Sequence, residues 1–121
     1  MPANSKLKGA IGEELAAEYL QSKGYTLVGM NYRVRGGEID VIVKNRKYLV
    51  FAEVKTRKNA NFAMAMEFVN EAKMQRLIVA AKLYLAANPT RLQPRFDVIE
   101  VYAPDGGKPF INHIENAFSE G

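Results

Sequence analysis

The feature that most constrains the fold is a pair of strand-like segments separated by only four residues. Residues 38–43 and 48–55 are rich in β-branched and aromatic side chains, as strands are. A connection as short as residues 44–47 joins two strands only as an antiparallel hairpin. The hairpin also carries Asp40, Glu53 and Lys55 among apolar neighbours. The sequence therefore predicts a β-sheet that holds charged groups close to its core.

The other periodic patterns add two helices and three strands to this hairpin. Apolar residues recur at helical spacing in residues 4–23 and 71–87, and Gly24 and Pro89 follow the two helix ends. Residues 25–33, 95–102 and 110–114 have strand patterns. The order predicts an α/β (α+β) fold, a mixed central sheet flanked by helices. No repeat or linker divides the 121 residues, so we expect a single domain over residues 1–121.

Composition excludes several classes of chemistry. The chain has no cysteine and one histidine, which rules out disulfides, thiol nucleophiles and multi-histidine metal sites. Its apolar runs fall well short of the roughly 18 residues of a membrane span, and its first twelve residues lack the apolar stretch of a signal peptide. We therefore expect a cytoplasmic protein with no membrane partner. Its chemistry must depend on carboxylates, lysines and arginines.

Positive charge is concentrated in residues 31–58. This segment has eight basic and three acidic residues, a net charge of +5 within a chain of net charge +4. A basic stripe is typical of a nucleic-acid binder. A lysine-rich hairpin that stays soluble and protects a sheet edge gives the same pattern, and charge alone leaves both interpretations open. The eight basic residues are Arg33, Arg35, Lys44, Arg46, Lys47, Lys55, Arg57 and Lys58.

The register of the hairpin decides whether its carboxylates converge. With the turn centred on residues 45 and 46, Asp40 lies opposite Phe51 and diagonal to Glu53. Diagonal neighbours have Cα atoms roughly 7–8 Å apart, and their side chains share a face. A slip of one residue would place Glu53 and Lys55 on the other face from Asp40. The tight connection favours the convergent register.

Two converging carboxylates repel each other, and a hard divalent cation relieves that repulsion. Mg²⁺ commonly takes one or two carboxylates together with water and a substrate phosphate. Lys55 follows Glu53 by two residues on the same face, where it could orient the attacking water or stabilise the phosphate. The alternative is a salt-bridged hairpin in which Glu53 and Lys55 only satisfy each other. The placement of acids beside apolar residues 50–52 favours the metal site.

These residues also carry a family resemblance. Asp40 followed by Glu53-Val54-Lys55 resembles the PD-(D/E)xK signature of restriction-endonuclease-like nucleases, with Ile39 in place of the proline. Nearly the whole chain resembles the YraN family of uncharacterised bacterial proteins, which is similar to archaeal Holliday-junction resolvases. The motifs that carry this resemblance are Gly12-Glu13-Glu14-Leu15-Ala16, Asn31-Tyr32-Arg33, Gly36-Gly37-Glu38-Ile39-Asp40, Phe51-Ala52-Glu53-Val54-Lys55-Thr56-Arg57, Lys73 and Arg95-Phe96-Asp97-Val98.

The resemblance implies a particular set of site residues. Asp40 and Glu53 would be metal ligands and catalytic residues, and Lys55 the catalytic lysine. Glu13 on the first helix would complete the metal site, with Glu14 as the fallback. The implied cofactor is Mg²⁺ or Mn²⁺.

Two functions follow from these observations. The first is a metal-dependent nuclease that hydrolyses phosphodiester bonds, with DNA, branched or otherwise structured, as the expected partner. The alternative is a non-catalytic nucleic-acid-binding module on the same scaffold. A homodimer is possible, because a junction presents two equivalent strands. The expected nucleic-acid-binding residues are Arg33, Arg35, Arg57, Lys58, Lys73 and Arg76.

Overall fold

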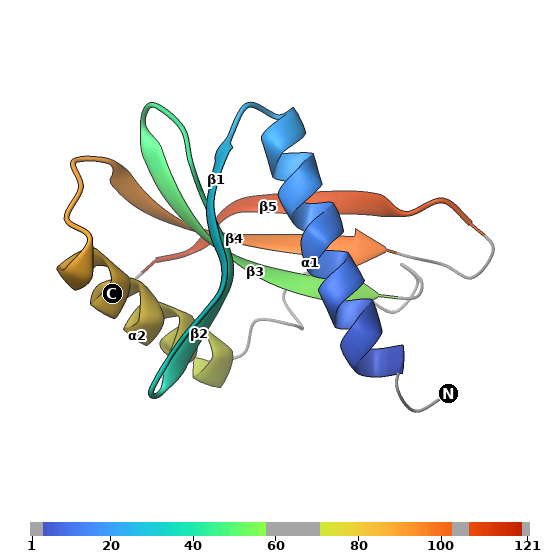
Figure 1. The fold of residues 1–121 in the computed structure, drawn as a ribbon, viewed down its shortest axis with the longest axis horizontal. Helices are drawn as coiled ribbons and strands as arrows, with labels where there is room; N and C mark the ends of the chain where they lie inside the picture. The colour runs from blue at the N-terminus through green and yellow to red at the C-terminus, as the bar shows by residue number, and fades with distance from the viewer. Residues whose placement is uncertain (1–3, 58–70, 103–106, 120–121) are drawn as a thin grey trace.

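In the part of the chain that the structure describes, five strands form one mixed sheet with a helix on each face (Figure 1). The structure is a computed structural model that describes residues 4–57, 71–102 and 107–119. The elements in chain order are α1 (Asn4–Ser22), β1 (Thr26–Val34), β2 (Gly37–Lys44), β3 (Tyr48–Arg57), α2 (Glu71–Ala87), β4 (Gln93–Tyr102) and β5 (Phe110–Phe118). The predicted mixed sheet and the order of its elements are confirmed.

The strands lie in the sheet in their sequence order. β1, β2 and β3 pair antiparallel, β3 and β4 pair parallel, and β5 returns antiparallel to β4. Two parallel neighbours need a long crossover, and the segment that contains α2 provides it. β5 continues four residues beyond its predicted end. Asn116 there has a φ of 51°, and its N–H donates to the Asp97 carboxylate at 3.0 Å, which supports the strand where its pairing with β4 is irregular.

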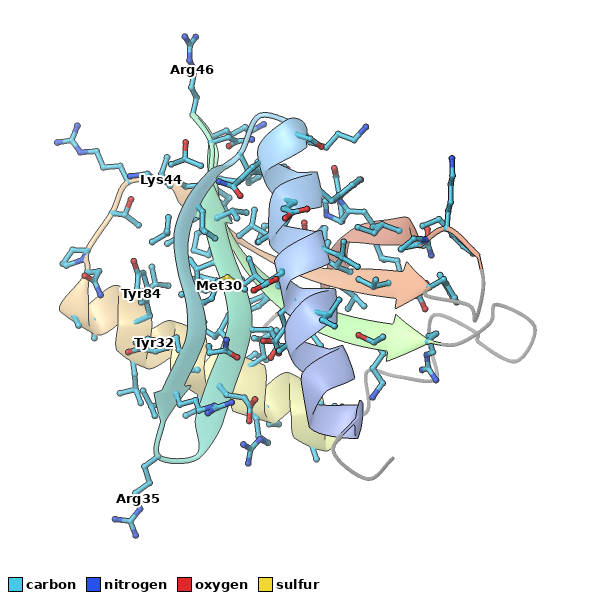
Figure 2. All side chains as sticks on the ribbon, turned by 45° about the vertical axis from the view of Figure 1, so that its right-hand side comes forward. Met30, Tyr32, Arg35, Lys44, Arg46 and Tyr84 are labelled. Atoms are coloured by element: carbon cyan, nitrogen blue, oxygen red, sulfur yellow. The ribbon has the colours of Figure 1, made fainter. Side chains whose placement is uncertain are left out.

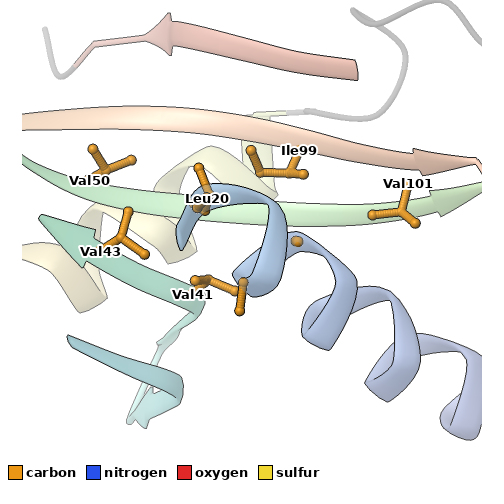
Figure 3. Close-up of a cluster of buried hydrophobic side chains, with 9 residues drawn as sticks. Leu20, Val41, Val43, Val50, Ile99 and Val101 are labelled. Atoms are coloured by element: carbon orange, nitrogen blue, oxygen red, sulfur yellow. The ribbon is translucent and has the colours of Figure 1, made fainter. Parts of the chain in front are cut away.

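The core has one layer on each side of the sheet. Ala16, Ala17 and Leu20 of α1 pack on the face that carries Val41, Val43, Val50 and Ile99 (Figure 3). On the other face, Leu77, Ala80 and Ala81 of α2 pack on Ile39, Ile42, Leu49 and Phe51. Ile11 of α1, although apolar, is 47% exposed. Both faces of β2 and β3 are therefore covered by a helix, which explains their nearly continuous apolar sequences.

The β2–β3 hairpin differs from its predicted register by two residues. Val43 pairs with Val50 and Val41 with Ala52, so Tyr48 is not opposite Val43 and Phe51 is not opposite Asp40. The reason is the Asn45 side chain, whose Oδ1 accepts the N–H groups of Lys47 and Tyr48 at 2.9 and 2.7 Å. These bonds move the turn toward residues 46 and 47. A shift of two residues preserves which side chains share a face.

The alternation of β2 is interrupted at Asp40. Ile39 packs in the α2 layer and Val41 in the α1 layer, although residues two apart along a strand normally share a face. The neighbouring strand changes in the same place, since Met30 packs with α1 and Tyr32 with α2. Between them Asn31 has a φ of 54°, in the left-handed region that asparagine tolerates. The β1–β2 hairpin therefore twists sharply around Asp40.

Candidate functional site

The candidate site lies where β2 and β3 separate. Their ladder ends at Val41 and Ala52, while β3 continues beside β4 as far as Arg57. Figure 1 shows β2 turning away from β3 beyond this point. We call this place the fork: the end of the β2–β3 ladder together with Asp40, Glu53 and Lys55. It is open to groups from both faces of the sheet.

Asp40 occupies the fork itself. Its Oδ2 accepts the N–H of Val54 at 2.8 Å, so the carboxylate takes a backbone donor that lies beyond the end of the ladder. The residue is 7% exposed. Burial, followed by the negative charge of Glu53, raises the pKa of Asp40 to about 7, against the lowering effect of the Val54 hydrogen bond. Asp40 is thus an acid held close to a second negative charge and away from water.

Glu53 lies on the α2 side of β3. Burial raises its pKa, and the positive charges of Lys73 and Lys55 partly offset that rise. The Nζ of Lys73 is 3.7 Å from Glu53 Oε2. A weak ion pair therefore already compensates one of the two carboxylates of the fork.

Lys55 points into the same environment as Glu53. Its pKa is lowered, first by its interaction with the Lys73 ammonium, then by burial and by the charge of Arg57, while Glu53 acts in the opposite direction. Two lysines therefore flank one glutamate, and the lowered pKa makes Lys55 easier to deprotonate than an ordinary lysine. The alternative of an isolated Glu53–Lys55 salt bridge does not describe this arrangement, because Lys73 participates.

α1 brings Glu13 to the other side of the fork. Gly12 is buried, and a Cβ at this position would overlap Oγ1 of Thr56 on β3, so the glycine permits a close approach of helix and strand. Glu13, half-buried beside it, is near enough to contribute to the raised pKa of Asp40. Glu14, the fallback residue, is exposed.

A small cleft opens on the α2 side of the fork. Its volume is about 130 Å³, and it is lined by Glu38, Glu53, Lys73 and Arg76. Arg76 donates to Glu38 Oε1 at 3.0 Å. The cleft thus presents two carboxylates and two cations, paired as Glu53 with Lys73 and Glu38 with Arg76.

The carboxylate oxygens of Asp40 and Glu53, completed by water, are suitable ligands for a hard cation. Asp40 and Glu53 are both shielded from solvent, and the charge of Glu53 raises the pKa of Asp40, so a divalent ion would relieve an existing repulsion. Among the residues that the structure describes, no three His, Asp or Glu side chains are grouped so as to hold a metal ion. The fit therefore rests on Asp40 and Glu53, and a direct role for Glu13 stays a prediction.

The predicted nucleic-acid-binding residues divide into two groups. Arg57, Lys73 and Arg76 lie beside the fork, where they interact with Lys55, Glu53 and Glu38 respectively. Arg33 and Arg35 are exposed, Arg33 on β1 and Arg35 at the tip of the β1–β2 hairpin (Figure 2). Lys58 lies outside the described residues.

The basic segment 31–58 does not form one stripe. Figure 2 shows Arg35 and Arg46 extending from opposite ends of the molecule, Arg35 at the β1–β2 turn and Arg46 at the β2–β3 turn. Two turns at opposite ends of one strand separate charges that are close in the sequence. The single stripe that the charge count indicated is therefore wrong.

Sequence reasoning missed the role of Glu38 and the backbone conformation of Asn31. No role was expected for Glu38, although it lines the cleft and pairs with Arg76. The φ of 54° at Asn31 was not expected either. A signal for Glu38 was present, because a third acid in the same strand pair as Asp40 and Glu53 needs a cation nearby. No sequence signal marked the Asn31 backbone beyond the tolerance of asparagine for that conformation.

No helix in the described ranges is both long enough and apolar enough to cross a membrane.

Comparison with known proteins identifies the family. The model of "Uncharacterised protein family UPF0102" matches residues 12–101. A UPF0102 protein of Caldanaerobacter subterraneus subsp. tengcongensis is 42% identical over 118 residues, which cover 95% of this chain and 97% of that protein. UPF0102 proteins of Clostridioides difficile and Alkaliphilus oremlandii are 44% and 45% identical, each over 95% of this chain and 99% of the relative. The matched region contains Glu13 and every residue of the fork, and the chain belongs to the UPF0102 family, the YraN family that its motifs resemble.

Proposed function

We propose that this protein is a metal-dependent nuclease that hydrolyses phosphodiester bonds in nucleic acid, with branched or structured DNA as its substrate class. The observation that carries the proposal is the fork, where two shielded carboxylates and a lysine of lowered pKa meet at the end of a strand ladder. Metal-binding acids and a cation for the reacting phosphate are the groups that phosphodiester hydrolysis requires.

Each group of the fork has a role in this reaction. Asp40 and Glu53 would hold Mg²⁺ or Mn²⁺, which supplies charge neutralisation at the phosphate and a lowered pKa for bound water. Lys55 would orient the attacking water or stabilise the developing charge on the phosphate, and its lowered pKa suits a group that exchanges a proton. Lys73 would transfer its ion pair from Glu53 to a substrate phosphate.

A second candidate function is a nucleic-acid-binding module without catalysis. The ion pair between Lys73 and Glu53 favours it, because this contact already neutralises one carboxylate. This alternative predicts salt-dependent binding with no strand scission in any divalent metal.

The deciding experiment is a cleavage assay with purified protein. Duplex, single-stranded, flap and four-way-junction DNA are incubated with Mg²⁺ or Mn²⁺, and Asp40→Asn, Lys55→Ala and the exposed control Glu18→Gln are assayed in parallel. We expect cleavage by the wild type and by Glu18→Gln, and loss of at least a hundredfold in the other two. Cleavage that survives Asp40→Asn would contradict the nuclease proposal, and binding without cleavage would favour the second function.

A junction substrate adds a requirement for assembly. Two equivalent strands must be cut, so a domain of this size would act as a homodimer. Sedimentation of the protein with and without four-way-junction DNA tests this part of the proposal.

A further inference from the structure

We infer that the turn between β2 and β3 binds the phosphodiester backbone of a nucleic-acid strand, as a contact separate from the fork. The surface consists of Lys44, Asn45, Arg46 and Lys47, which we call the basic turn. Its three cations belong to the basic segment 31–58, but none of the four residues is in the set of nucleic-acid-binding residues expected above. The inference rests on the proposed function only in taking nucleic acid as the partner.

The cations of the basic turn are exposed and available. Lys44, Arg46 and Lys47 all lie in solvent, and Figure 2 shows Arg46 extending away from the molecule with Lys44 beside the same end. Within residues 4–57, 71–102 and 107–119, no carboxylate forms an ion pair with any of the three. This differs from the fork, where Lys73 and Arg76 each face a glutamate.

The turn is also fixed in position. Besides the two bonds that Asn45 Oδ1 accepts, the N–H of Asn45 donates to the Tyr48 carbonyl at 3.0 Å. The N–H of Gln93 donates to the Lys47 carbonyl at 2.8 Å and so ties the turn to β4. A backbone that is already ordered loses little conformational entropy when its side chains bind a ligand.

The surface beside the turn is hollowed. A cleft of about 530 Å³ is lined by the basic turn together with Gly24 and Thr26. A Cβ at Gly24 would meet no atom within 4 Å, so this wall is open to a large ligand. The lining of this cleft contains no acidic residue. Three cations around an open cleft match the regular negative charges of a nucleic-acid backbone.

An aromatic ring continues the surface toward a neighbouring cleft. The Nζ of Lys47 lies 5.2 Å from the centre of the Tyr48 ring, and the Arg95 guanidinium lies 4.6 Å from it. Tyr48 and Arg95 line a second cleft of about 350 Å³, in which Glu115 is the acidic residue. An aromatic side chain beside a basic groove is typical of sites that contact bases as well as phosphates.

The alternative role, protection of a sheet edge, does not apply to this turn. Lysines protect edges when they lie on an outermost strand. In the order β1-β2-β3-β4-β5, the strands that flank the basic turn are both interior. Its charges therefore shield no unpaired backbone.

Charge reversal tests the inference without any need for catalysis. The test pair is Lys44→Glu/Arg46→Glu, and the matched control is Lys82→Glu/Lys108→Glu, at exposed positions of α2 and just before β5. Each pair lowers the net charge from +4 to zero. Binding to a labelled 20-nucleotide single strand and to its duplex is measured by fluorescence anisotropy, in EDTA, from 50 to 200 mM salt. Circular dichroism verifies folding, and Lys44→Gln/Arg46→Gln replaces the test pair if it fails to fold.

We expect the test pair to weaken binding at least tenfold relative to the control pair. The slope of log affinity against log salt for the duplex should fall in magnitude by about two, one for each lost phosphate contact. Equal affinity of the test and control pairs would overturn the inference, and so would a wild type that binds neither DNA. Binding that depends on the basic turn in a protein that cuts no substrate would support this inference while the proposed nuclease fails.

Discussion

Asp40 places an acid where the folded state disfavours its charge, and this gives a first prediction. Its raised pKa of about 7 means that the Asp40 contribution favours folding below the unfolded pKa near 4 and is lost as the pH rises through 7. Asp40→Asn keeps an oxygen that can accept the Val54 N–H but removes the charge. We expect the variant to be more stable at pH 8 by roughly 1–3 kcal/mol, and to be inactive.

Urea denaturation at pH 8 and at pH 4 measures this effect. The stability gained by Asp40→Asn should shrink toward pH 4, because Asp40 is then already neutral in the folded wild type. Glu18→Gln, on the exposed face of α1, should change stability little at either pH. If Asp40→Asn is no more stable than wild type at pH 8, the ionised Asp40 carboxylate does not destabilise the folded state.

Asp97 shows the opposite behaviour. It is fully buried, and although burial acts to raise its pKa, hydrogen bonds from His113, Arg95 and the Asn116 N–H lower it. A lowered pKa contributes stability above the unfolded value near 4, and that contribution is lost as the pH falls through the folded value. The free energy of unfolding should therefore decline below pH 4.

Asp97→Asn tests this network. It leaves Arg95 buried without its carboxylate, at a cost of roughly 3–5 kcal/mol at pH 7. The difference in unfolding free energy between wild type and Asp97→Asn should narrow as the pH falls from 4 to 2. Unfolding curves at several pH values measure it. A constant difference over that range would show that the Asp97 charge is not what the network stabilises.

The contact between β2 and α2 depends on one glycine. A Cβ at Gly37 would overlap the Arg76 carbonyl oxygen and lie 2.9 Å from the Ala80 nitrogen, both backbone atoms of α2. Gly37→Ala must push the helix away from the strand, and we expect a loss of about 1–3 kcal/mol in unfolding free energy. Gly29→Ala is the matched control, because a Cβ there meets no atom within 4 Å. Similar losses in the two variants would contradict the close approach at Gly37.

Most elements could be predicted from their own residues, whereas their junctions could not. The second helix runs over residues 71–87 as expected, because its apolar spacing and the Asn88-Pro89 stop are both local. The hairpin register was off by two because Asn45 makes side-chain bonds that spacing does not reveal. The added length of β5 depends on the bond between Asn116 and Asp97, 19 residues apart in the chain. Such contacts exist only after the elements have packed.

The candidate site was predictable in part for the same reason. Parity along β3 alone was enough to place Glu53 and Lys55 in one environment, because residues two apart on one strand share a face whatever the register of the hairpin. The twist at Asp40, which turns its neighbours Ile39 and Val41 to opposite faces, had no such signal. The position of the fork therefore had to come from the structure.

At the scale of the whole molecule, the arrangement of charge differs from its distribution along the chain. One segment of net charge +5 supplies cations to both ends of β2. At the β1–β2 end Arg35 extends into solvent, and at the other end Lys44, Arg46 and Lys47 surround an open cleft. A count along the sequence adds these charges together, while a strand about 25 Å long separates them.

Glu13, Asp40 and Glu53 come from three elements, α1, β2 and β3, so a metal ion bound at the fork should stabilise the whole fold. An unfolded chain has no such site, and a ligand that binds only the folded state adds RT ln(1 + [L]/Kd) to its stability. For a Kd on the order of 1 mM, 10 mM Mn²⁺ adds about 1.4 kcal/mol, which corresponds to a rise in Tm of roughly 3–6 °C. Differential scanning fluorimetry measures the shift. We expect it in wild type and in Glu18→Gln but not in Glu53→Gln, and an equal shift in all three proteins would place the bound metal away from Glu53.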